Sequence, residues 1–230
     1  MSNTDIKAIF ERDKDLLFQE ITTLRSYFDL HIHIRKRRND RLEILNKAPA
    51  FFGLVQESLL HSTIVGLSKL FEQRNKNGKT IYKFLNFLEV NHSKIFSENA
   101  HFYDSFHNIV YISSDLIESH KAQLKEQNPV LDNLFIWRDK SFAHSDKKYF
   151  EDPESLGEDH PITFKQLREL FELATGILNS YESAYNNSYH STQATNTTDI
   201  DTILDYLHKI EPYKREVNQL LREKRRNDEN

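Results

Sequence analysis

The side chains best suited to chemistry gather in one segment, Trp137 to Asp146, which reads Trp-Arg-Asp-Lys-Ser-Phe-Ala-His-Ser-Asp. A guanidinium binds phosphate through two parallel hydrogen bonds. An imidazole is the side chain most easily set to take or give a proton near neutral pH. Arg138 and His144 could therefore cleave RNA without a metal. The imidazole would remove the proton of a ribose 2′-OH, and the guanidinium would stabilise the charge that builds up on the phosphate.

The spacing of Arg138 and His144 limits this chemistry. The two residues are six positions apart, so on an ideal α-helix their directions differ by about 240° and their heights by about 9 Å. One straight helix does not aim both at one phosphate. A kink would help, and so would a second copy related by a two-fold axis, which places two Arg138 and two His144 around one cleft. The alternative is an ion-pair and capping cluster between helices, with no chemistry.

Basic side chains form two further clusters. The first comprises Arg35, Lys36, Arg37, Arg38 and Arg41, and the second runs from Arg222 to Arg226. The formal net charge of −4 does not suggest a chain coated by nucleic acid, so RNA binding would have to come from such local clusters. The first cluster is the candidate RNA-binding surface. The alternative for each is a solvated helix face.

Metal and cofactor sites are not indicated. The chain has no Cys, which excludes disulfides and Cys-ligated zinc. His31 and His33 have a ligand spacing that would share one face of a strand, but residues two apart on a helix do not share a face, and the surrounding pattern is helical. The sequence also lacks His-Glu-x-x-His, a Gly-rich phosphate loop and the Gly-x-Ser-x-Gly turn of serine hydrolases.

Long helices must position these residues. The chain has only five Gly and five Pro, and all-β chains need such residues at their turns. Apolar residues recur at helical spacing over about 5–46 (with a possible break near 38–40), 49–71, 80–91, 97–126, 129 to the Arg138 segment, and 163–185. A last helical region starts at 199 and is expected to be interrupted by Pro212. The segment from about 147 to 162 is expected to be a loop.

Several local signals support these helices. The helix over 51–71 is apolar on most faces and should be central in the bundle, with Gly53 and Gly66 allowing close approach of a neighbour. Thr80 is a helix cap, and Thr163 with Gln166 forms a capping box.

The predicted fold is an all-α, up-and-down helical bundle over residues 1–187. A polar linker over 188–198 leads to a C-terminal helical extension over 199–230, a candidate appendage or dimerisation arm. No signal peptide and no apolar run of the roughly 20 residues needed to span a membrane is apparent. The cytoplasm is therefore the expected location.

In this order of helices the motif resembles that of the HEPN superfamily, in which Arg is followed by four to six residues and His; here five separate Arg138 from His144. The longer pattern Arg-Asp-Lys-x-x-Ala-His-Ser-Asp at 138–146 resembles the abortive-infection branch of phage-defence proteins. The resemblance covers about residues 5–190, including the apolar helix over 51–71 and the helix start at Ile162-Thr163.

The resemblance implies a bundle that forms a homodimer through the motif. It also implies a metal-independent endoribonuclease that acts as a toxin or defence effector on an RNA substrate, with no cofactor. Arg138 and His144 match the two fixed positions and Asp139 matches the polar residue after Arg. Lys140 and Asp146 match preferences of the branch.

One departure from the family concerns neutralisation. A toxin subgroup carries Tyr two residues after His, where an antitoxin nucleotidyltransferase modifies it. Asp146 stands there in this chain, so an antitoxin or defence partner would have to act in another way. Some HEPN proteins bind RNA or nucleotides without cutting, which keeps a non-catalytic helical adaptor as the alternative function. A dimer in which Arg138 and Asp139 only form interface ion pairs is a third.

Overall fold

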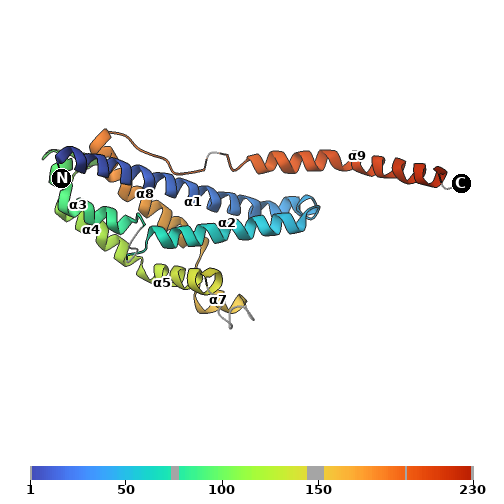
Figure 1. Cartoon of the computed structure of the whole chain (residues 1–230), viewed down its shortest axis with the longest axis horizontal. Coiled ribbons are helices and arrows are strands. Elements are labelled where there is room, and N and C mark those ends of the chain that lie inside the picture. Colours follow the sequence, from blue (N-terminus) through green and yellow to red (C-terminus); the bar gives the residue numbers. More distant parts are fainter. Residues whose placement is uncertain (1, 74–77, 144–152, 195, 229–230) are drawn as a thin grey trace.

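The computed structural model describes residues 2–73, 78–143, 153–194 and 196–228; for residues 141–143, 153, 154, 211, 215 and 226–228 only the backbone is described. Long helices pack lengthwise in this part of the chain, a small hairpin lies at one end, and the last helix projects beyond the other (Figure 1). The predicted all-α helical bundle is confirmed.

The helices and strands follow one another in a simple order. They are α1 (Asn3–Leu45), α2 (Pro49–Leu70), α3 (Ile81–Ile95), β1 (His101–Tyr103), β2 (Ile109–Tyr111), α4 (Ser114–Glu126), α5 (Asn128–Trp137), the π-helix η1 (Arg138–Ala143), α7 (Pro153–Asp159), α8 (Phe164–Asn186) and α9 (Asp199–Asp228).

Helix ends follow the local signals of the sequence. Ser2 caps α1 and forms a capping box with Asp5. Thr80 caps α3, and Thr163 forms the predicted capping box with Gln166 at the start of α8. In each case a side-chain oxygen accepts from a backbone N–H that has no partner within the helix. The expected break in α1 also exists, at Arg41, where φ is −128° and ψ is 20°.

The main core is formed by α1, α2, α3, α4, α5 and α8 together. Phe10 of α1 is fully buried, and its ring meets those of Phe84, Phe96 and Tyr185 at centroid distances of 5.8, 5.4 and 5.0 Å. Edge-on and offset contacts of this kind stabilise a core beyond the area they bury. These rings hold α3 and α8 on the N-terminal half of α1.

A buried ion pair crosses this core. Lys14 of α1 donates to Glu182 of α8, and each side chain is only 3% exposed. Burial alone would raise the pKa of Glu182, but hydrogen bonds from Lys14, Ser188 and Asn186 outweigh it and lower the pKa to about 2. Ser188 belongs to the segment after α8, so this carboxylate also directs the chain as it leaves the bundle.

Close packing of α2 on α1 depends on Gly66. A Cβ built at Gly66 would lie 2.0 Å from Leu24 Cδ2, whereas one at Gly53 meets nothing within 4 Å. The expected close approach is therefore confirmed at Gly66 and wrong at Gly53.

The expectation that α2 is central in the bundle is only half correct. Its C-terminal half is buried on α1, but Phe51 and Leu54 near its start are 61% and 64% exposed. By length and composition alone, α2 is apolar enough to cross a membrane, which differs from the expectation that no such run exists, and 33% of its most apolar window is buried. The second half of α2 packs on α1, with Leu67 and Leu70 buried.

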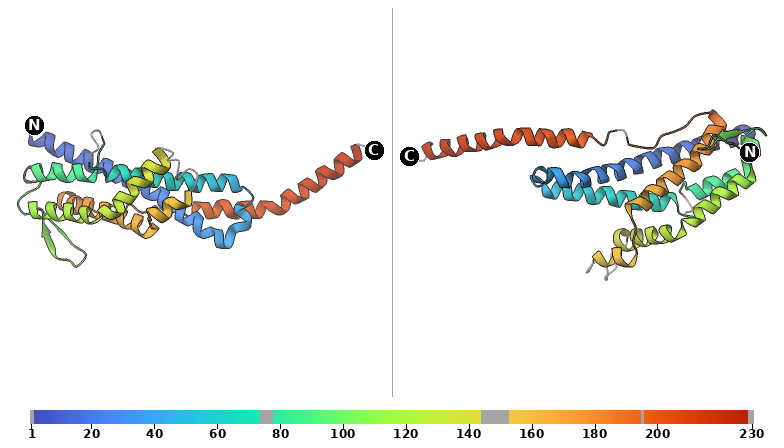
Figure 2. Two further views of the ribbon diagram at one scale, coloured as in Figure 1. Left: turned by 90° about the horizontal axis from the view of Figure 1, so that it is seen from below. Right: turned by 180° about the vertical axis from the view of Figure 1, so that it is seen from behind.

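The helix expected over 97–126 is wrong in its first half, where the chain forms a hairpin (Figure 2). β1 and β2 pair antiparallel, with Phe102 opposite Val110. Asp104 sets the turn, because its carboxylate accepts from the backbone N–H groups of Phe106 and Asn108, both at 2.8 Å. Asp side chains that bind nearby backbone compete with helix formation, and His107 takes a positive φ of 62°. The spacing that suggested one long helical stripe was therefore misleading.

Two further expectations need correction. The stretch predicted as a loop before residue 162 contains α7, with Leu156 buried. Pro212 does not interrupt the last helix, because α9 continues through it. A proline lacks the N–H that would bond to the carbonyl of residue i−4 and its ring crowds that carbonyl, but a long exposed helix can bend to accommodate it, and α9 changes direction along its length (Figure 2).

Gly66→Ala should destabilise the protein by about 1–3 kcal/mol, because the added methyl group overpacks the contact with the buried Leu24. The matched variant in the same helix, Gly53→Ala, should stabilise by up to about 1 kcal/mol through helix propensity alone. Urea unfolding followed by circular dichroism measures both. Equal effects of the two variants would contradict the packing described for Gly66.

His120 should make stability depend on pH. Its ring is buried, with Nδ1 2.9 Å from the Tyr181 hydroxyl, and burial lowers its pKa to about 4. The unfolded chain takes up this proton near pH 6.5 and the native state only near pH 4. The lowered pKa of His120 therefore adds to the free energy of unfolding above pH 6.5. This stabilisation, about 3 kcal/mol in total, is lost as the pH falls toward 4.

Between pH 6.5 and 4, the slope of the unfolding free energy against pH reports how many protons the chain takes up on unfolding. His120→Gln should lower that number by close to one. Urea titrations at several pH values measure this slope. An unchanged slope in the variant would show that His120 is not the group responsible.

Candidate active site

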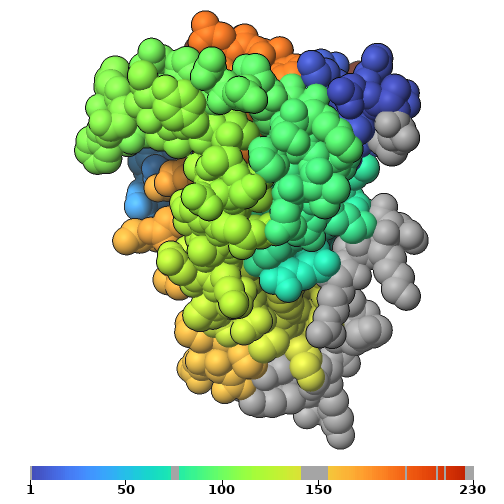
Figure 3. Space-filling view, turned by 90° about the vertical axis from the view of Figure 1, so that its left-hand side faces the viewer, coloured from blue at the N-terminus to red at the C-terminus, as the bar shows by residue number. Residues whose placement is uncertain are grey.

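α5 carries the motif and is held from two sides. On one side, Trp137 Nε1 donates to the carbonyl of His160 at 2.7 Å, and Asn133 Nδ2 donates to that of Pro161 at 3.0 Å. On the other, Ser68 Oγ of α2, which donates to the Ile64 carbonyl at 2.7 Å, also lies 3.4 Å from the carbonyl of Leu134. These contacts fix the end of α5, and with it the start of the motif. Figure 3 shows the face that α3, α4 and α5 form together.

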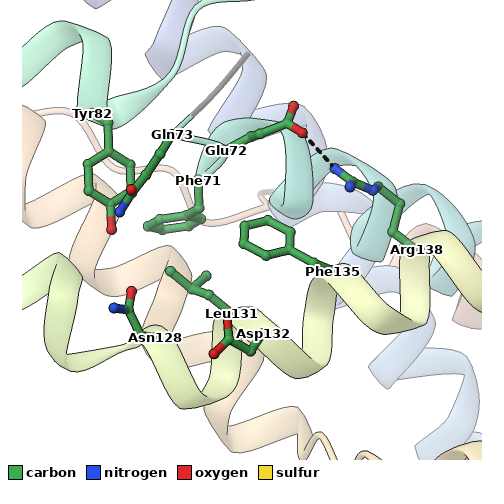
Figure 4. Close-up of a pocket in the computed structure, with 9 residues that line it drawn as sticks. All are labelled: Phe71, Glu72, Gln73, Tyr82, Asn128, Leu131, Asp132, Phe135 and Arg138. Atoms are coloured by element: carbon green, nitrogen blue, oxygen red, sulfur yellow. Dashed lines mark hydrogen bonds and ion pairs between the residues drawn. The ribbon is translucent and has the colours of Figure 1, made fainter.

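Arg138 lies at the junction of α5 and η1, and two carboxylates hold its guanidinium. Nε donates to Asp139 at 2.7 Å, and Nη1 donates to Glu72, just beyond α2, at 3.2 Å (Figure 4). The guanidinium also lies 5.4 Å from the centre of the Phe135 ring. Its side chain is 21% exposed. The hydrogen bond to Asp139, more than that to Glu72, raises the pKa of Arg138 against the effect of burial, so the side chain carries a permanent, oriented charge.

A cavity of about 440 Å³ opens beside this guanidinium. Its lining combines aromatic faces with amide, carboxylate and hydroxyl groups: Phe71, Glu72, Gln73, Tyr82, Asn128, Leu131, Asp132, Phe135 and Arg138 (Figure 4). The Tyr82 hydroxyl is buried and has no hydrogen-bond partner in the described part of the chain. The volume lies in the range of small-molecule pockets, and the polar lining is suited to a hydrogen-bonding ligand.

The backbone of the motif is a π-helix from Arg138 to Ala143. A π-helix closes hydrogen bonds five residues apart rather than four and is frequent at functional sites. The geometry of an ideal α-helix therefore does not apply to residues 138–143. This local distortion lies in the segment for which a kink was one of two ways to bring Arg138 and His144 to one phosphate.

The structure describes only some of the predicted site residues. Arg138 and Asp139 are brought together, and Lys140 is half-buried in η1. His144 and Asp146 lie outside the described residues. Glu72 was not predicted, because its role arises from a contact between residues 66 positions apart. The only signal in the sequence is an acidic residue directly after the apolar run of α2.

Part of the basic cluster of α1 lies against α9. Arg37 donates to both carboxylate oxygens of Asp201, at 2.6 and 2.7 Å, and these bonds lower the pKa of Asp201 to about 2. Arg41 pairs with Asp205 at 2.7 Å. Two of the five predicted RNA-binding side chains therefore have intramolecular carboxylate partners.

The other three members of that cluster differ. Lys36 and Arg38 are exposed. Arg35 is exposed too, with its guanidinium 5.1 Å from the centre of the Phe164 ring at the start of α8. The preceding residues, 160 and 161, are those that bind α5. Arg35 therefore contacts the start of α8, just after the residues that bind the motif helix α5.

The side chains of His31 and His33 contact different groups and do not share a ligand site. His31 Nδ1 donates to the Gln56 carbonyl at 3.0 Å, and His33 Nε2 lies 2.9 Å from Asp201. Both sit in helical backbone, as the surrounding pattern indicated. Among the described residues, no group of three or more His, Asp or Glu side chains could hold a metal ion.

Comparison with known proteins gives one result. The model of a HEPN family described as AbiU2 matches residues 7–207. No curated protein and no solved structure matches the chain. The matched region contains the bundle, the Arg138 motif and the start of α9.

Proposed function

The chain belongs to the AbiU2 family of HEPN proteins, and on that premise we propose that it is a metal-independent endoribonuclease of a toxin or phage-defence system, acting in the cytoplasm. The observation that carries the proposal is Arg138, a charged guanidinium oriented by two carboxylates at the rim of a 440 Å³ cavity. Its substrate is RNA, and its working form is a homodimer through the motif.

Arg138 binds the scissile phosphate in this proposal. A guanidinium has five N–H groups in a planar fork, more than its two carboxylate contacts use. Glu72 and Asp139 hold the plane of that fork before substrate arrives, and pre-oriented donors stabilise the charge of a transition state without further reorganisation. They also reduce the net charge at the site, which keeps general binding of anions weak.

His144 is the general base. It takes the proton of the ribose 2′-OH, the 2′-oxygen bonds to phosphorus, and the bond from phosphorus to the 5′-oxygen breaks. The leaving 5′-oxygen takes a proton, which we assign to the His144 of the second copy. The products are a 2′,3′-cyclic phosphate and a 5′-hydroxyl. Lys140 and Asp146 support the site, and the exposed Arg35, Lys36 and Arg38 contact the flanking RNA backbone.

A non-catalytic RNA-binding adaptor is the second candidate. It is favoured by the ion pairs that Arg37, Arg41 and Arg138 already make within the chain. Such a protein would bind RNA through the remaining exposed cations, with strong salt dependence and no turnover. In either case an antitoxin or another defence component is a further expected partner.

The purified chain should cut RNA in the presence of EDTA and leave 2′,3′-cyclic phosphate ends. His144→Ala should lower the rate by about 10²–10⁴-fold, the range for loss of a general base, with its helical circular dichroism unchanged. Gel analysis of a labelled RNA measures the cleavage rate and identifies the product ends. Equal cutting by wild type and His144→Ala would reject the ribonuclease. RNA binding without turnover would leave the adaptor as the function.

Two substitutions of Glu72 should separate its positioning effect from its charge. Glu72→Gln retains an oxygen that accepts from Arg138 but removes the negative charge, so RNA should bind several-fold tighter at low salt. Glu72→Ala removes the acceptor as well, so the guanidinium loses its orientation and kcat should fall about tenfold or more. Single-turnover cleavage and titration of RNA against the fluorescence of Trp137, the only tryptophan, measure the two effects. Identical behaviour of both variants would contradict a positioning role.

A further inference from the structure

The helix α9 is anchored at its base and open along the rest of its length. Ile200 and Leu204 are buried in a small core with α1 and α2, and Asp201 and Asp205 bind Arg37 and Arg41 of α1. Beyond this anchor the helix extends past the α1–α2 turn, away from the bundle (Figure 1). The described side chains in the remainder of this extension are exposed, including large apolar ones such as Ile210 and Tyr213.

The open part of α9 carries one continuous apolar seam. Its residues follow one another at alternating steps of three and four: Ile203, Tyr206, Ile210, Tyr213, Val217 and Leu220. All six are exposed, from 50% at Ile203 to 67% at Tyr213. Three heptads with apolar first and fourth positions are the pattern of a coiled coil. The first positions, Ile203, Ile210 and Val217, are all β-branched.

Charge along the seam selects the direction of pairing with a copy of the same helix. In a parallel pair, Lys209 would face the partner's Lys214, and the two positive charges would repel. In an antiparallel pair in which Ile210 packs against the partner's Tyr213, Lys209 faces the partner's Glu216, and the reverse contact is equally favourable. Lys214 then lies beside the partner's Leu207, which its aliphatic stem can cover.

The same antiparallel register pairs every apolar layer with another. Ile203 meets the partner's Leu220, and Tyr206 meets the partner's Val217. Ile210 meets the partner's Tyr213, and symmetry repeats these contacts to give six layers. Pro212 occupies the third heptad position, on the side of α9 turned away from the seam. The Pro212 ring therefore lies outside the proposed interface.

We propose that α9 pairs with the α9 of a second copy of this chain as an antiparallel two-stranded coiled coil centred between Glu211 and Pro212. The seam is self-complementary in its apolar layers and in its flanking charges, which fits a second copy better than an unrelated helix or a membrane surface. The proposal does not rest on the ribonuclease, and the interface is separate from the Arg138 motif.

The first test is the mass of the full chain in solution, by light scattering after gel filtration. Ile210→Asp with Val217→Asp should halve the mass of the assembly, whether that assembly contains two chains or, if the motif also pairs, four. Asn218→Asp with Gln219→Asp adds the same charge on the outer side of α9 and should leave the mass unchanged. A monomeric wild type, or an unchanged mass in the seam variant, would overturn the proposal.

The second test reports the direction of pairing and does not depend on how well a charged variant folds. The chain has no Cys, so single cysteines can be placed freely. Mixing Ile203→Cys with Leu220→Cys, one of them enlarged by a tag, should give the mixed disulfide. A disulfide between two copies of Ile203→Cys would indicate parallel pairing, and no disulfide would indicate no pairing; either result overturns the proposal.

A charge exchange tests the register. Lys209→Glu should weaken association on the order of tenfold, because two exposed ion pairs become two repulsive ones. Adding Glu216→Lys to the same chain should restore the wild-type dissociation constant. Sedimentation equilibrium measures all three proteins, and a double variant no tighter than Lys209→Glu would contradict the proposed register.

Discussion

The contact between Gly66 and Leu24 is the constraint on which the candidate site depends. Because residue 66 has no side chain, α2 lies directly on α1, and a Cβ there would overlap Leu24. This contact sets where α2 runs along α1 and therefore where it ends. Two residues further on, Ser68 reaches the backbone of α5. Glu72, just beyond the end of α2, meets Arg138. A glycine in the core thus determines the position of a charged group at the surface.

Arg138 combines two requirements that oppose each other. A phosphate-binding guanidinium needs fixed orientation, and the carboxylates that orient it also reduce its net charge. Glu72 and Asp139 fix the orientation at some cost in net charge, because they engage Nη1 and Nε. The Arg138 side chain is also one of those that line the cavity. In the proposed ribonuclease, such a site favours a ligand that offers more than one phosphate charge, because a single anion must compete with two carboxylates. The proposed RNA substrate meets that condition.

Carboxylates also decide how the chain leaves the bundle. Glu182, buried with Lys14, accepts from Ser188, and Asn179 binds the backbone of His190 at both its amide and its carbonyl. The polar segment after α8 is therefore held against the bundle by hydrogen bonds as well as by its few apolar contacts. Asp201 and Asp205 then fasten the start of α9 to the arginines of α1. The consequence is an α9 with a defined direction and an apolar seam open along its outer part.

The sequence by itself determined the features that depend on neighbours along the chain. Caps such as Ser2 and Thr163, the apolar face of α8, the start of α2 at Pro49 and the motif at Arg138 could all be predicted, because each rests on residues a few positions apart. Only the tertiary structure decided the rest. It turned residues 101–111 into a hairpin, directed Arg37 to Asp201 and brought Glu72 to Arg138. The last two are contacts between residues distant in the chain, and helical periodicity carries no information about which distant side chains meet. The hairpin is local, but the Asp104 turn and the paired strands prevailed over a spacing that also suited a helix.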